Sequence, residues 1–554
     1  MSKVWTRLAA AVASIAIAGA GFVGVSSAFA EDSGNSDGTV TINNTAKGDS
    51  YDAYRLLDAT VSGKDVTYTV NAKYAKVLQE VTGKTGDDVI KYISSLDTTK
   101  VTGKATSVEN GGDSTAVRAF AAKVMAAIKQ AGLAPDAVET ATCDTLTFKV
   151  PMGYYLFAQT GIEDQGNQVG TNNDSADTYS SLMMHSVLSS PLVITAKSGT
   201  VTVTKKVMDN DDNLENTANQ MGNTTGKWVD SADYAIDDKV PFQITGTLPA
   251  NLNSYSSFKY VITDKLSAGF TTHDYMVTVY AVNGTEKQDI TYDEDVSVTV
   301  SGSPQTLTVS MANLLAVPGV AWSPSTKIVV EYHADLNHSA VIAGEGNTNE
   351  AKITFSNNSE GDGNGATSDT PYDKTVVFTY KVDVTKTFDV APTGGDMPQF
   401  KLYVFTGTCK DPTADAKGWQ VVEDAASGDP THTVTRDASG AYVTAPWNGV
   451  DSGIYMLKET YTPVGYSTAA PVIFKIQGDH ETSSDDPKLI NASSVNKTIT
   501  VENKSTAKSP SGIPASLPST GGMGTTLMYV AGGLVVVLAG VGLALALRKR
   551  RAEM

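Results

Sequence analysis

Short runs in which apolar and polar residues alternate recur along most of this chain. Valine and threonine are frequent in them, as in the runs Val201–Lys205 and Val382–Lys386, and glycine, asparagine and aspartate separate them. Alternation with a period of two gives a strand one apolar and one polar face. Short strands with frequent turn residues between them are typical of antiparallel β-sandwiches. The sequence therefore predicts a mainly β protein.

One segment breaks this alternation. From Asn71 to about Leu133, apolar residues recur three and four positions apart, most clearly between Ala116 and Ala131. This spacing lines one face of a helix. The first domain is therefore expected to be a β-structure that carries a helical insertion.

Both ends of the sequence predict export. Residues 1–30 have the basic start, the apolar stretch and the small-residue cleavage site of a signal peptide. The apolar run 527–547 is long enough to cross a bilayer as a helix, and the basic tail 548–554 is expected to stay in the cytoplasm. The chain is therefore expected to be exported and then held at the membrane.

The composition argues against several classes of protein. A formal net charge of -18 disfavours nucleic acid or an anionic membrane as a partner. The two cysteines, Cys143 and Cys409, lie far apart, so no disulfide framework is expected, and both are interpreted as ordinary core or strand residues. The histidines are scattered and no glycine-rich phosphate loop occurs, so neither a metal nor a cofactor is expected.

The length of the chain predicts several domains. Nearly five hundred residues lie between the two ends, which is more than one hydrophobic core usually organises. The similar segments Gly153–Gln159 and Gly453–Glu459 indicate repeated β-modules. The predicted division is a first domain at 31–197, a second at 198–360, a linker at 361–371, a third at 372–503 and a stalk at 504–516.

Three polar side chains of the third domain are predicted to point into its core. Lys386, Glu459 and Asn503 each lie in phase with apolar residues of their own strand. Isolated buried charges are costly, so the amine and the carboxyl group should meet or neutralise. Burial lowers the pKa of a lysine and raises that of a glutamate, which favours a neutral amine beside a protonated acid. The amine can then attack the Asn503 carboxamide, with loss of ammonia, to leave an isopeptide crosslink.

The second domain repeats this pattern with an aspartate. Lys205, Asp264 and Asn349 are each in phase with apolar neighbours, so a bond between Lys205 and Asn349, assisted by Asp264, is expected. Asn347 has the same phase and is a rival acceptor. In both domains the alternative is an ordinary buried ion pair beside a hydrogen-bonded asparagine.

A motif ahead of the apolar run 527–547 resembles a known processing signal. Leu517, Pro518, Thr520 and Gly521, with the serine between them, resemble the LPxTG sorting signal of Gram-positive surface proteins. The resemblance implies that a sortase cleaves after Thr520 and passes its carbonyl group to an amine. The membrane anchor would then be temporary, and the mature protein is expected in the cell wall or in a fimbria at the cell surface.

Further segments resemble sortase-assembled pilins. Residues 455–466 resemble their E-box, residues 501–503 the terminal strand of their CnaB-type domains, and residues 264–269 the aspartate-bearing strand of their CnaA-type domains. The chain thus resembles a major, or shaft, pilin with tandem Ig-like β-sandwich domains, the second CnaA-like and the third CnaB-like. The resemblance implies an isopeptide bond in each of these two domains, promoted by Asp264 and Glu459.

Lys197 is a candidate for joining subunits. It lies just past an apolar strand and before Ser198-Gly199, so it is expected to be exposed at the junction of the first two domains. In the pilins that this chain resembles, a lysine at this junction receives the threonine acyl group of the next subunit. This chain has Ile-Thr-Ala-Lys where many relatives have Tyr-Pro-Lys. A solvated surface lysine is the alternative.

The first domain departs from the pattern at one position. Gln159 stands where its counterpart segment has Glu459. Because glutamine cannot shuttle a proton, we hypothesise that this domain lacks an internal crosslink and is the most labile of the three.

These features predict a structural shaft subunit of a covalently polymerised fimbria rather than an enzyme, apart from the single-turnover formation of its own bonds. The resemblance implies as partners a sortase, other copies of the chain head to tail, minor pilins and peptidoglycan, with host surface or matrix ligands as a further candidate class and no nucleic acid. The main alternative is a monomeric wall-anchored adhesin. A surface enzyme is a third interpretation, for which the sequence offers no site.

Overall fold

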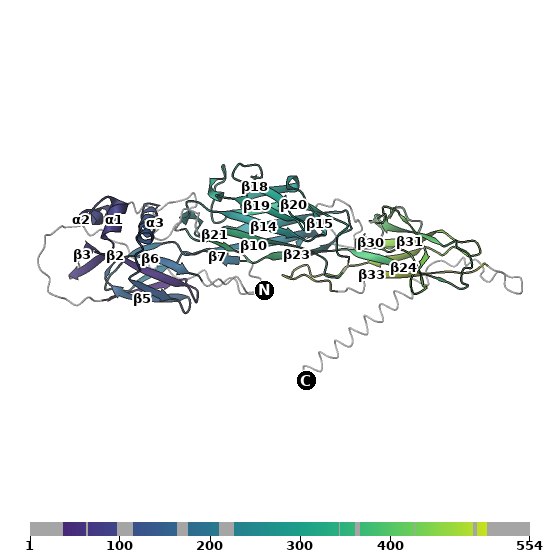
Figure 1. The fold of residues 1–554 in the computed structure, drawn as a ribbon, viewed down its shortest axis with the longest axis horizontal. Coiled ribbons are helices and arrows are strands. Elements are labelled where there is room, and N and C mark those ends of the chain that lie inside the picture. The colour runs from purple at the N-terminus through teal and green to yellow at the C-terminus, as the bar shows by residue number, and fades with distance from the viewer. Residues whose placement is uncertain are drawn as a thin grey trace, which may run out of the picture.

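Three β-units follow one another along the molecule in the computed structural model (Figure 1). The structure describes residues 37–62, 65–96, 115–162, 175–209, 227–342, 344–359, 366–425, 427–490 and 496–506. The predicted signal peptide, the sorting signal 517–521, the apolar run 527–547 and the basic tail lie outside these ranges, as does most of the predicted stalk. Within the described ranges, no helix has the length and apolar character needed to cross a membrane.

The first unit packs a three-stranded sheet, in the order β5-β1-β9, against a five-stranded sheet in the order β3-β2-β6-β8 with β4 beside β2. Buried residues of both sheets, such as Ile42, Phe148 and Phe157, form the core between them. The strands are β1 (Asp37–Asn43), β2 (Ser50–Ser62), β3 (Asp65–Val70), β4 (Ala137–Thr140), β5 (Thr145–Pro151), β6 (Gly153–Gly161), β8 (Met183–Val187) and β9 (Leu192–Thr195).

The predicted helical insertion is confirmed. Helices α1 (Ala75–Thr82), α2 (Asp87–Ser94) and α3 (Thr115–Gln130) lie between β3 and β4 in sequence. Their apolar faces form a second cluster with Leu56 and Leu156 of the five-stranded sheet. The insertion therefore covers the face of that sheet that the sandwich core leaves open.

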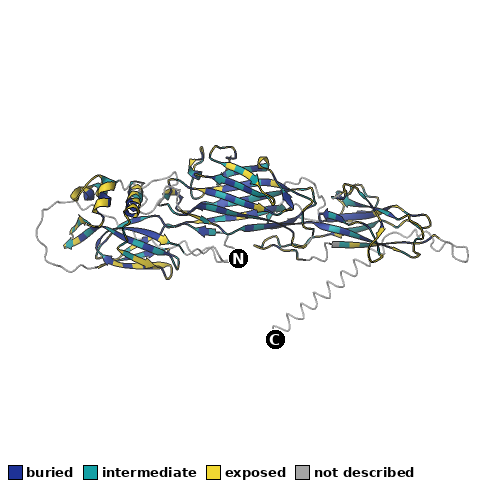
Figure 2. Ribbon diagram, viewed as in Figure 1, coloured by how far each residue is buried: buried dark blue, intermediate teal, exposed yellow. Residues whose placement is uncertain are grey.

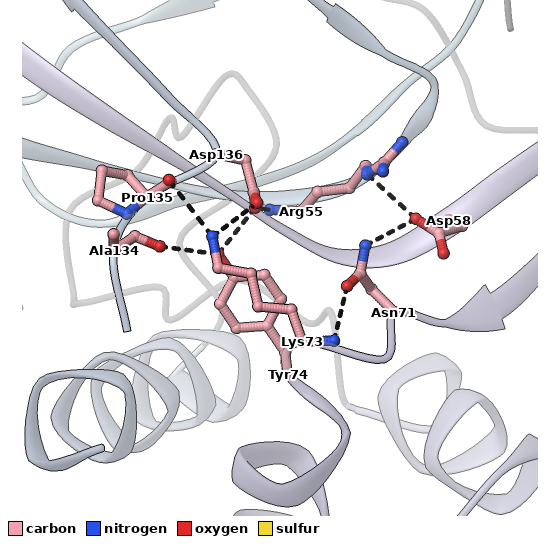
Figure 3. A network of polar contacts seen from close by, with 8 residues as sticks. All are labelled: Arg55, Asp58, Asn71, Lys73, Tyr74, Ala134, Pro135 and Asp136. Carbon is pink, nitrogen blue, oxygen red and sulfur yellow. Dashed lines mark hydrogen bonds and ion pairs between the residues drawn. The ribbon is translucent and has the colours of Figure 1, made fainter. Parts of the chain in front are cut away.

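Asp136 ties both ends of the insertion to β2 (Figure 3). Its carboxylate accepts hydrogen bonds from the backbone N–H of Arg55 at 2.7 Å and from the hydroxyl of Tyr74 at 2.8 Å, and it pairs with the Lys73 ammonium at 2.8 Å. Burial and the neighbouring Asp136 raise the pKa of Tyr74, so its hydroxyl stays protonated as a donor. The entrance and the exit of the insertion are thus both held by this one carboxylate, which lies at the surface.

The middle unit is the largest sandwich. One eight-stranded sheet has the order β11-β10-β13-β20-β16-β17, with β15 beside β20 and β7 beside β10, and the facing seven-stranded sheet has the order β12-β23-β21-β14-β19-β18, with β22 beside β21. Figure 2 shows buried residues throughout its interior. The strands are β7 (Ser175–Asp177), β10 (Thr200–Asp209), β11 (Lys227–Val229), β12 (Ser231–Asp233), β13 (Lys239–Thr247), β14 (Tyr260–Leu266), β15 (Phe270–Thr271), β16 (Val277–Asn283), β17 (Glu286–Asp289), β18 (Ser297–Ser301), β19 (Thr306–Met311), β20 (Lys327–Leu336), β21 (Asn347–Ser356), β22 (Thr367–Asp369) and β23 (Asp373–Phe378), with short 3-10 turns η2 (Leu252–Ser254), η3 (Asp274–Met276) and η4 (Leu314–Ala316).

The middle unit extends beyond the predicted linker. Strands β22 and β23, which lie within and just after 361–371, both pair with β21. A polar segment can complete a sheet in this way because the ladder uses backbone groups, which every such residue supplies. The boundary predicted at 361–371 therefore falls too early, and the third unit follows almost directly after β23.

The third unit is a smaller sandwich. One sheet has the order β28-β29-β24-β30 with β33 beside β24, and the other has the order β26-β25-β31-β32 with β27 beside β25. Its first and last strands, β24 and β33, are parallel neighbours. The strands are β24 (Tyr380–Phe388), β25 (Gln399–Phe405), β26 (Trp419–Val421), β27 (Thr431–Thr433), β28 (Thr435–Arg436), β29 (Tyr442–Val443), β30 (Trp447–Val450), β31 (Gly453–Tyr461), β32 (Val472–Ile476) and β33 (Asn496–Asn503). The predicted mainly β fold of tandem sandwiches is confirmed.

A buried carboxylate joins the middle and third units. Asp233 of β12 accepts hydrogen bonds from the hydroxyls of Tyr380, at 2.8 Å, and Ser452, both of the third unit. His480 Nε2 lies 3.9 Å from the same carboxylate, and its Nδ1 is 2.8 Å from the Ser231 hydroxyl. Burial acts to lower the pKa of His480, but the nearby Asp233 outweighs it, and the pKa is raised.

The first prediction concerns this joint. Because the folded-state pKa of His480 is raised, protonated His480 stabilises the joint below the unfolded-state pKa, and this contribution is lost as the pH rises through the folded-state pKa. His480→Gln is therefore expected to lower the melting temperature of the third unit more at about pH 5.5 than at about pH 8.5. The matched control is His338→Gln, which changes an exposed histidine. Equal losses at the two pH values would contradict the assignment.

Candidate functional site

Two polar clusters lie inside the middle and third sandwiches, at the residues that the strand phase predicts. In the middle unit, Lys205 comes from β10 of one sheet, and Asp264 and Asn349 come from β14 and β21 of the facing sheet. The register pairs Asn349 with Leu266, two residues beyond Asp264, so the two polar side chains are close neighbours on the inner face. All three side chains are 0 % exposed.

The hydroxyl of Tyr332 connects these three residues. Lys205 Nζ lies 2.9 Å from each oxygen of Asp264 and donates a hydrogen bond of 3.0 Å to Tyr332 Oη. Asn349 Nδ2 donates to the same hydroxyl oxygen, and Tyr332 in turn donates to Asp264 Oδ2, both at 2.5 Å. Asn349 Oδ1, by contrast, has no hydrogen-bond partner among the described residues.

Sequence reasoning missed Tyr332. It lies on β20, beside β13 and in the same sheet as Lys205, and its ring stacks on Phe242 with the centroids 5.3 Å apart. Its phase with Val330 and Ala334 is typical of a core aromatic residue and carries no sign of a polar role. Nothing in the local pattern of β20 shows that its hydroxyl lies beside groups of three other strands.

Burial sets the protonation of this cluster. It lowers the pKa of Lys205 and raises the pKa of Asp264, and the attraction between the two groups opposes both shifts only in part. Burial and the nearby Asp264 also hold the pKa of Tyr332 well above its usual range. The Lys205 amine also lies over two aromatic rings, 5.0 Å from the centroid of Phe242 and 5.1 Å from that of Tyr332. The site therefore favours a neutral amine beside a protonated acid.

The rival acceptor Asn347 is engaged elsewhere. Its Oδ1 accepts from the backbone N–H of Val341 at 2.8 Å, and its Nδ2 donates to the carbonyl oxygens of Val341 and Val377, each at 3.2 Å. The side chain is thus held by backbone groups at the start of β21. Of the two candidates, Asn349 is the one that shares a partner with Lys205.

The third unit brings its acid and its amide into direct contact. Asn503 Nδ2 donates to Glu459 Oε1 at 2.9 Å, and Glu459 Oε2 accepts from the backbone N–H of Ala469 at 2.7 Å. All three predicted side chains, those of Lys386, Glu459 and Asn503, are buried. As in the middle unit, Asn503 Oδ1 has no partner among the described residues.

Lys386 lies beside this pair. It belongs to β24, which runs parallel to β33 with Phe388 opposite Asn503, so Lys386 and Asn503 sit two positions apart along neighbouring strands. Its Nζ donates to the carbonyl oxygens of Thr387 and Val501, at 2.8 and 2.9 Å. Burial lowers the pKa of Lys386 to about 8, against the opposing effect of nearby carboxylates. About a tenth of the amine is therefore neutral at pH 7, far more than for a lysine with an ordinary pKa near 10.5.

The first unit assembles no comparable cluster in its described part. Gln159 is buried, and its Oε1 accepts from the backbone N–H of Ser180 at 2.7 Å, while its Nε2 donates to the Gly161 carbonyl at 3.3 Å. None of the lysines described between 37 and 196 is buried. The glutamine thus makes local backbone hydrogen bonds at the position where the third unit has its acid.

Lys197 lies two residues beyond β9, between the first and middle units, and is half-buried rather than fully exposed. Its backbone N–H donates to the Ser180 hydroxyl at 2.8 Å, and its carbonyl accepts from the Ser181 N–H at 3.1 Å. The segment that carries the lysine is therefore held in place by its backbone.

Two other sequence interpretations can be compared with the structure. Cys143 and Cys409 were interpreted as core or strand residues, but both are exposed and lie outside the strands. That interpretation is therefore wrong: each cysteine lies in a turn or loop segment, where its side chain reaches the surface. Among the described residues, no group of histidine, cysteine, aspartate and glutamate side chains is arranged to hold a metal ion.

Comparison with known proteins places the middle unit in a family. Residues 236–359 match the family described as Gram-positive pilin backbone subunit 2, Cna-B-like domain. This chain contains a Gram-positive backbone-pilin domain. The finding confirms the resemblance to backbone pilins, and the family is one of structural pilins rather than enzymes; the LPxTG-like and E-box-like segments lie outside the matched residues. Its description names a Cna-B-like domain where the sequence analysis expected a CnaA-like one.

Three solved structures of pilins align with most of this chain. The T6 backbone pilin of serotype M6 Streptococcus pyogenes, described as a modular three-domain structure, has 15% sequence identity and a TM-score of 0.51, with 86% of this chain and 100% of that chain covered. The major pilin SpaD of Corynebacterium diphtheriae has 13% identity and a TM-score of 0.44, with coverage of 85% and 98%. The major pilin SpaA of the same organism has 14% identity and a TM-score of 0.43, with coverage of 84% and 100%. No curated protein matches the sequence.

The second prediction concerns the hydrogen-bond partners of the buried Lys205 amine in the middle cluster. In an Asn349→Ala background, which has no carboxamide to react, Asp264→Leu leaves the Lys205 amine buried without its acid. We expect the free energy of unfolding of the middle unit to fall by about 1–3 kcal/mol, because the buried amine loses a hydrogen-bond partner, and the addition of Lys205→Met to restore most of it. Hydrogen exchange of the β10 and β14 amides under denaturant measures both effects.

The control for this prediction is the more exposed pair of Lys287 and Glu331, where Lys287→Met is expected to change the same quantity by less than about 1 kcal/mol. If the double variant in the middle cluster is as unstable as Asp264→Leu alone, an unpaired buried amine is not the cause.

Proposed function

We propose that this chain is the structural shaft subunit of a covalently polymerised fimbria of a Gram-positive bacterium. The observation that carries the proposal is the cluster of Lys205, Asp264 and Asn349, which is sealed in the core of the unit that matches the backbone-pilin family. A buried amine, acid and carboxamide in contact through one hydroxyl have no evident use as a surface site. They are suited to reacting with one another once the sandwich has folded.

In the proposed reaction, the neutral Lys205 amine attacks Cγ of Asn349 while Asp264 exchanges protons with the reacting groups. The Nζ–Cγ bond forms, the Cγ–Nδ2 bond breaks, and ammonia leaves. The exclusion of water from the site favours the neutral amine, which is the nucleophilic form.

The third unit supports an equivalent bond between Lys386 and Asn503, with Glu459 as the acid. The lowered pKa of Lys386 and the direct Glu459–Asn503 hydrogen bond favour the reaction. To react, Lys386 Nζ must leave its two carbonyl partners and reach the Asn503 side chain on the neighbouring strand.

These bonds would limit extension of the chain. The third unit's bond joins its first strand, β24, to its last, β33, so a force applied at the two ends of the unit would pass through the bond rather than peel the strands apart. The middle bond likewise ties β10 to β21. A covalent tie also reduces the freedom of the unfolded chain. The first unit, with Gln159, is proposed to lack a bond and to be the most labile.

Polymerisation is proposed to join Thr520 of one subunit to Lys197 of the next through a sortase. Donor and acceptor are different surfaces of the same chain, so the contact is head to tail and can extend into a filament. Minor pilins and peptidoglycan are the proposed partners at the ends of the filament, with host surface or matrix ligands as a further class. A monomeric wall-anchored adhesin, with Thr520 joined directly to the wall, is the alternative.

The third prediction concerns the intramolecular bonds. The intact mass of the purified protein is expected to be lower than the sequence mass by one ammonia for each of the two bonds, because each bond releases one ammonia. Glu459→Ala and Asp264→Ala are each expected to restore one ammonia, since each removes the acid of one site. Unchanged mass in the wild-type protein, or a crosslinked lysine–asparagine peptide within residues 31–197, would contradict the assignment.

The fourth prediction concerns polymerisation. Immunoblots of wall extracts are expected to show a ladder of high-mass species that Lys197→Ala abolishes, because the acceptor amine is lost. Lys149→Ala, which changes an exposed lysine on β5 of the same unit, is the matched control and should leave the ladder intact. A single band in the wild-type strain would support the monomeric adhesin instead.

A further inference from the structure

The buried hydroxyl of Tyr332 takes part in three hydrogen bonds. It is 1 % exposed, yet its oxygen accepts from both Lys205 Nζ and Asn349 Nδ2 while its proton is donated to Asp264 Oδ2. A phenol has one donor and a limited acceptor capacity, and here all of it is directed at the three groups that the proposed crosslink involves. One hydrogen bond would have been enough to satisfy the buried hydroxyl.

The two sites differ in the contact between the acid and the asparagine Nδ2, the nitrogen that leaves as ammonia in the proposed reaction. In the third unit, Glu459 accepts directly from Asn503 Nδ2 at 2.9 Å. In the middle unit, the hydrogen bond of Asn349 Nδ2 goes to Tyr332, and Tyr332 contacts Asp264. Aspartate is one methylene shorter than glutamate. The phenol hydroxyl of Tyr332 bridges Asp264 and Asn349, which do not contact each other directly in the way that Glu459 and Asn503 do.

We propose that Tyr332 is a catalytic residue of the middle crosslink, which passes a proton from Asp264 to the departing nitrogen of Asn349. The inference rests on the proposed function, because it needs the Lys205–Asn349 bond to form. Tyr332 is then a fourth participant in the middle site. The shorter acid, Asp264, acts together with this tyrosine, whereas the longer acid of the third unit, Glu459, acts without one.

The proton transfers balance without another reactant. Attack of neutral Nζ on Cγ gives a tetrahedral intermediate with a positive charge on Nζ and a negative charge on Oδ1 of Asn349, whose electrons re-form the C=O bond when the Cγ–Nδ2 bond breaks. Protonated Asp264 gives the proton on Oδ2 to Tyr332 Oη, and Tyr332 gives its own proton to Nδ2, which leaves as ammonia when the Cγ–Nδ2 bond breaks. The excess proton on Nζ returns to Asp264 through Oδ1, which lies 2.9 Å away. The tyrosine and the acid end as they began.

The hydroxyl can serve this relay because its proton is free to rotate about the C–O bond. While Asp264 is ionised, Tyr332 donates to it. Once Asp264 is protonated, the carboxyl group can donate to Oη, and the phenol proton can turn toward Nδ2. The stacking of the ring on Phe242 holds Oη in position during the exchange.

The fifth prediction is that Tyr332→Phe slows this bond selectively. The change removes Oη and retains the ring. In the full-length protein, we expect the Lys205–Asn349 crosslinked peptide to appear on the order of a hundredfold more slowly after a pulse of synthesis, as measured by mass spectrometry. The Lys386–Asn503 peptide of the same molecules should form at the wild-type rate, which provides an internal control.

The matched control is Tyr260→Phe, which removes another fully buried hydroxyl of the middle unit, one that donates to the Thr247 carbonyl. It should leave the rate unchanged. Adding Asp264→Glu to Tyr332→Phe should recover part of the lost rate, because the longer acid can reach Nδ2 directly, as in the third unit. A purely structural role for Tyr332 gives no reason for this rescue.

The outcomes separate the two proposals. If the wild-type protein forms no Lys205–Asn349 bond, the proposed reaction of the middle unit fails. If the wild-type protein forms it and Tyr332→Phe forms it equally fast, only the role of Tyr332 is overturned. Should Tyr332→Phe fail to fold, a ring-fluorinated tyrosine at position 332 keeps the shape and makes the phenol more acidic. An unchanged rate with that residue would also overturn the relay.

Discussion

The burial of a lysine amine against a carboxyl group between two β-sheets is the interaction on which the rest of this structure depends. Such a pair is costly to remove from water, and it is tolerated only where the partners are in contact and their remaining hydrogen-bonding groups are satisfied. In the middle unit this requires β10 and β20 of one sheet to face β14 and β21 of the other in one register. The proposed covalent chemistry is thus a consequence of the packing of the sandwich.

The two sites meet the same requirement with different side chains. The third unit uses a glutamate that reaches the asparagine directly and is held by a backbone N–H, whereas the middle unit uses an aspartate and a tyrosine. In each, the asparagine carbonyl oxygen lacks a partner among the described residues. A buried acceptor without a donor is costly in a finished structure. The proposed reaction would consume this carboxamide, which gives a reason for its unsatisfied oxygen.

The joint between the middle and third units also contains a buried carboxylate whose hydrogen-bond partners are in place, but no reaction is proposed there. Asp233 is buried with two hydroxyl donors and a nearby histidine, and all three come from the third unit. Because β23 closes the middle sandwich immediately before β24 opens the third, the two units share both a short connection and the polar contact at Asp233. In a proposed shaft, such a joint would restrict bending between units.

The sequence by itself determined the features that depend on local period. Alternation predicted the β-sandwiches, a helical period predicted the insertion, and strand phase placed Lys205, Asp264, Asn349, Lys386, Glu459 and Asn503 on inner faces, because a side chain's face follows from its own strand. Tertiary structure alone decided which residues meet: that Tyr332 joins the middle cluster, that Asn349 rather than Asn347 contacts it, and that β22 and β23 complete the middle unit. These facts depend on the register between strands that are distant in sequence, and no local pattern encodes that register.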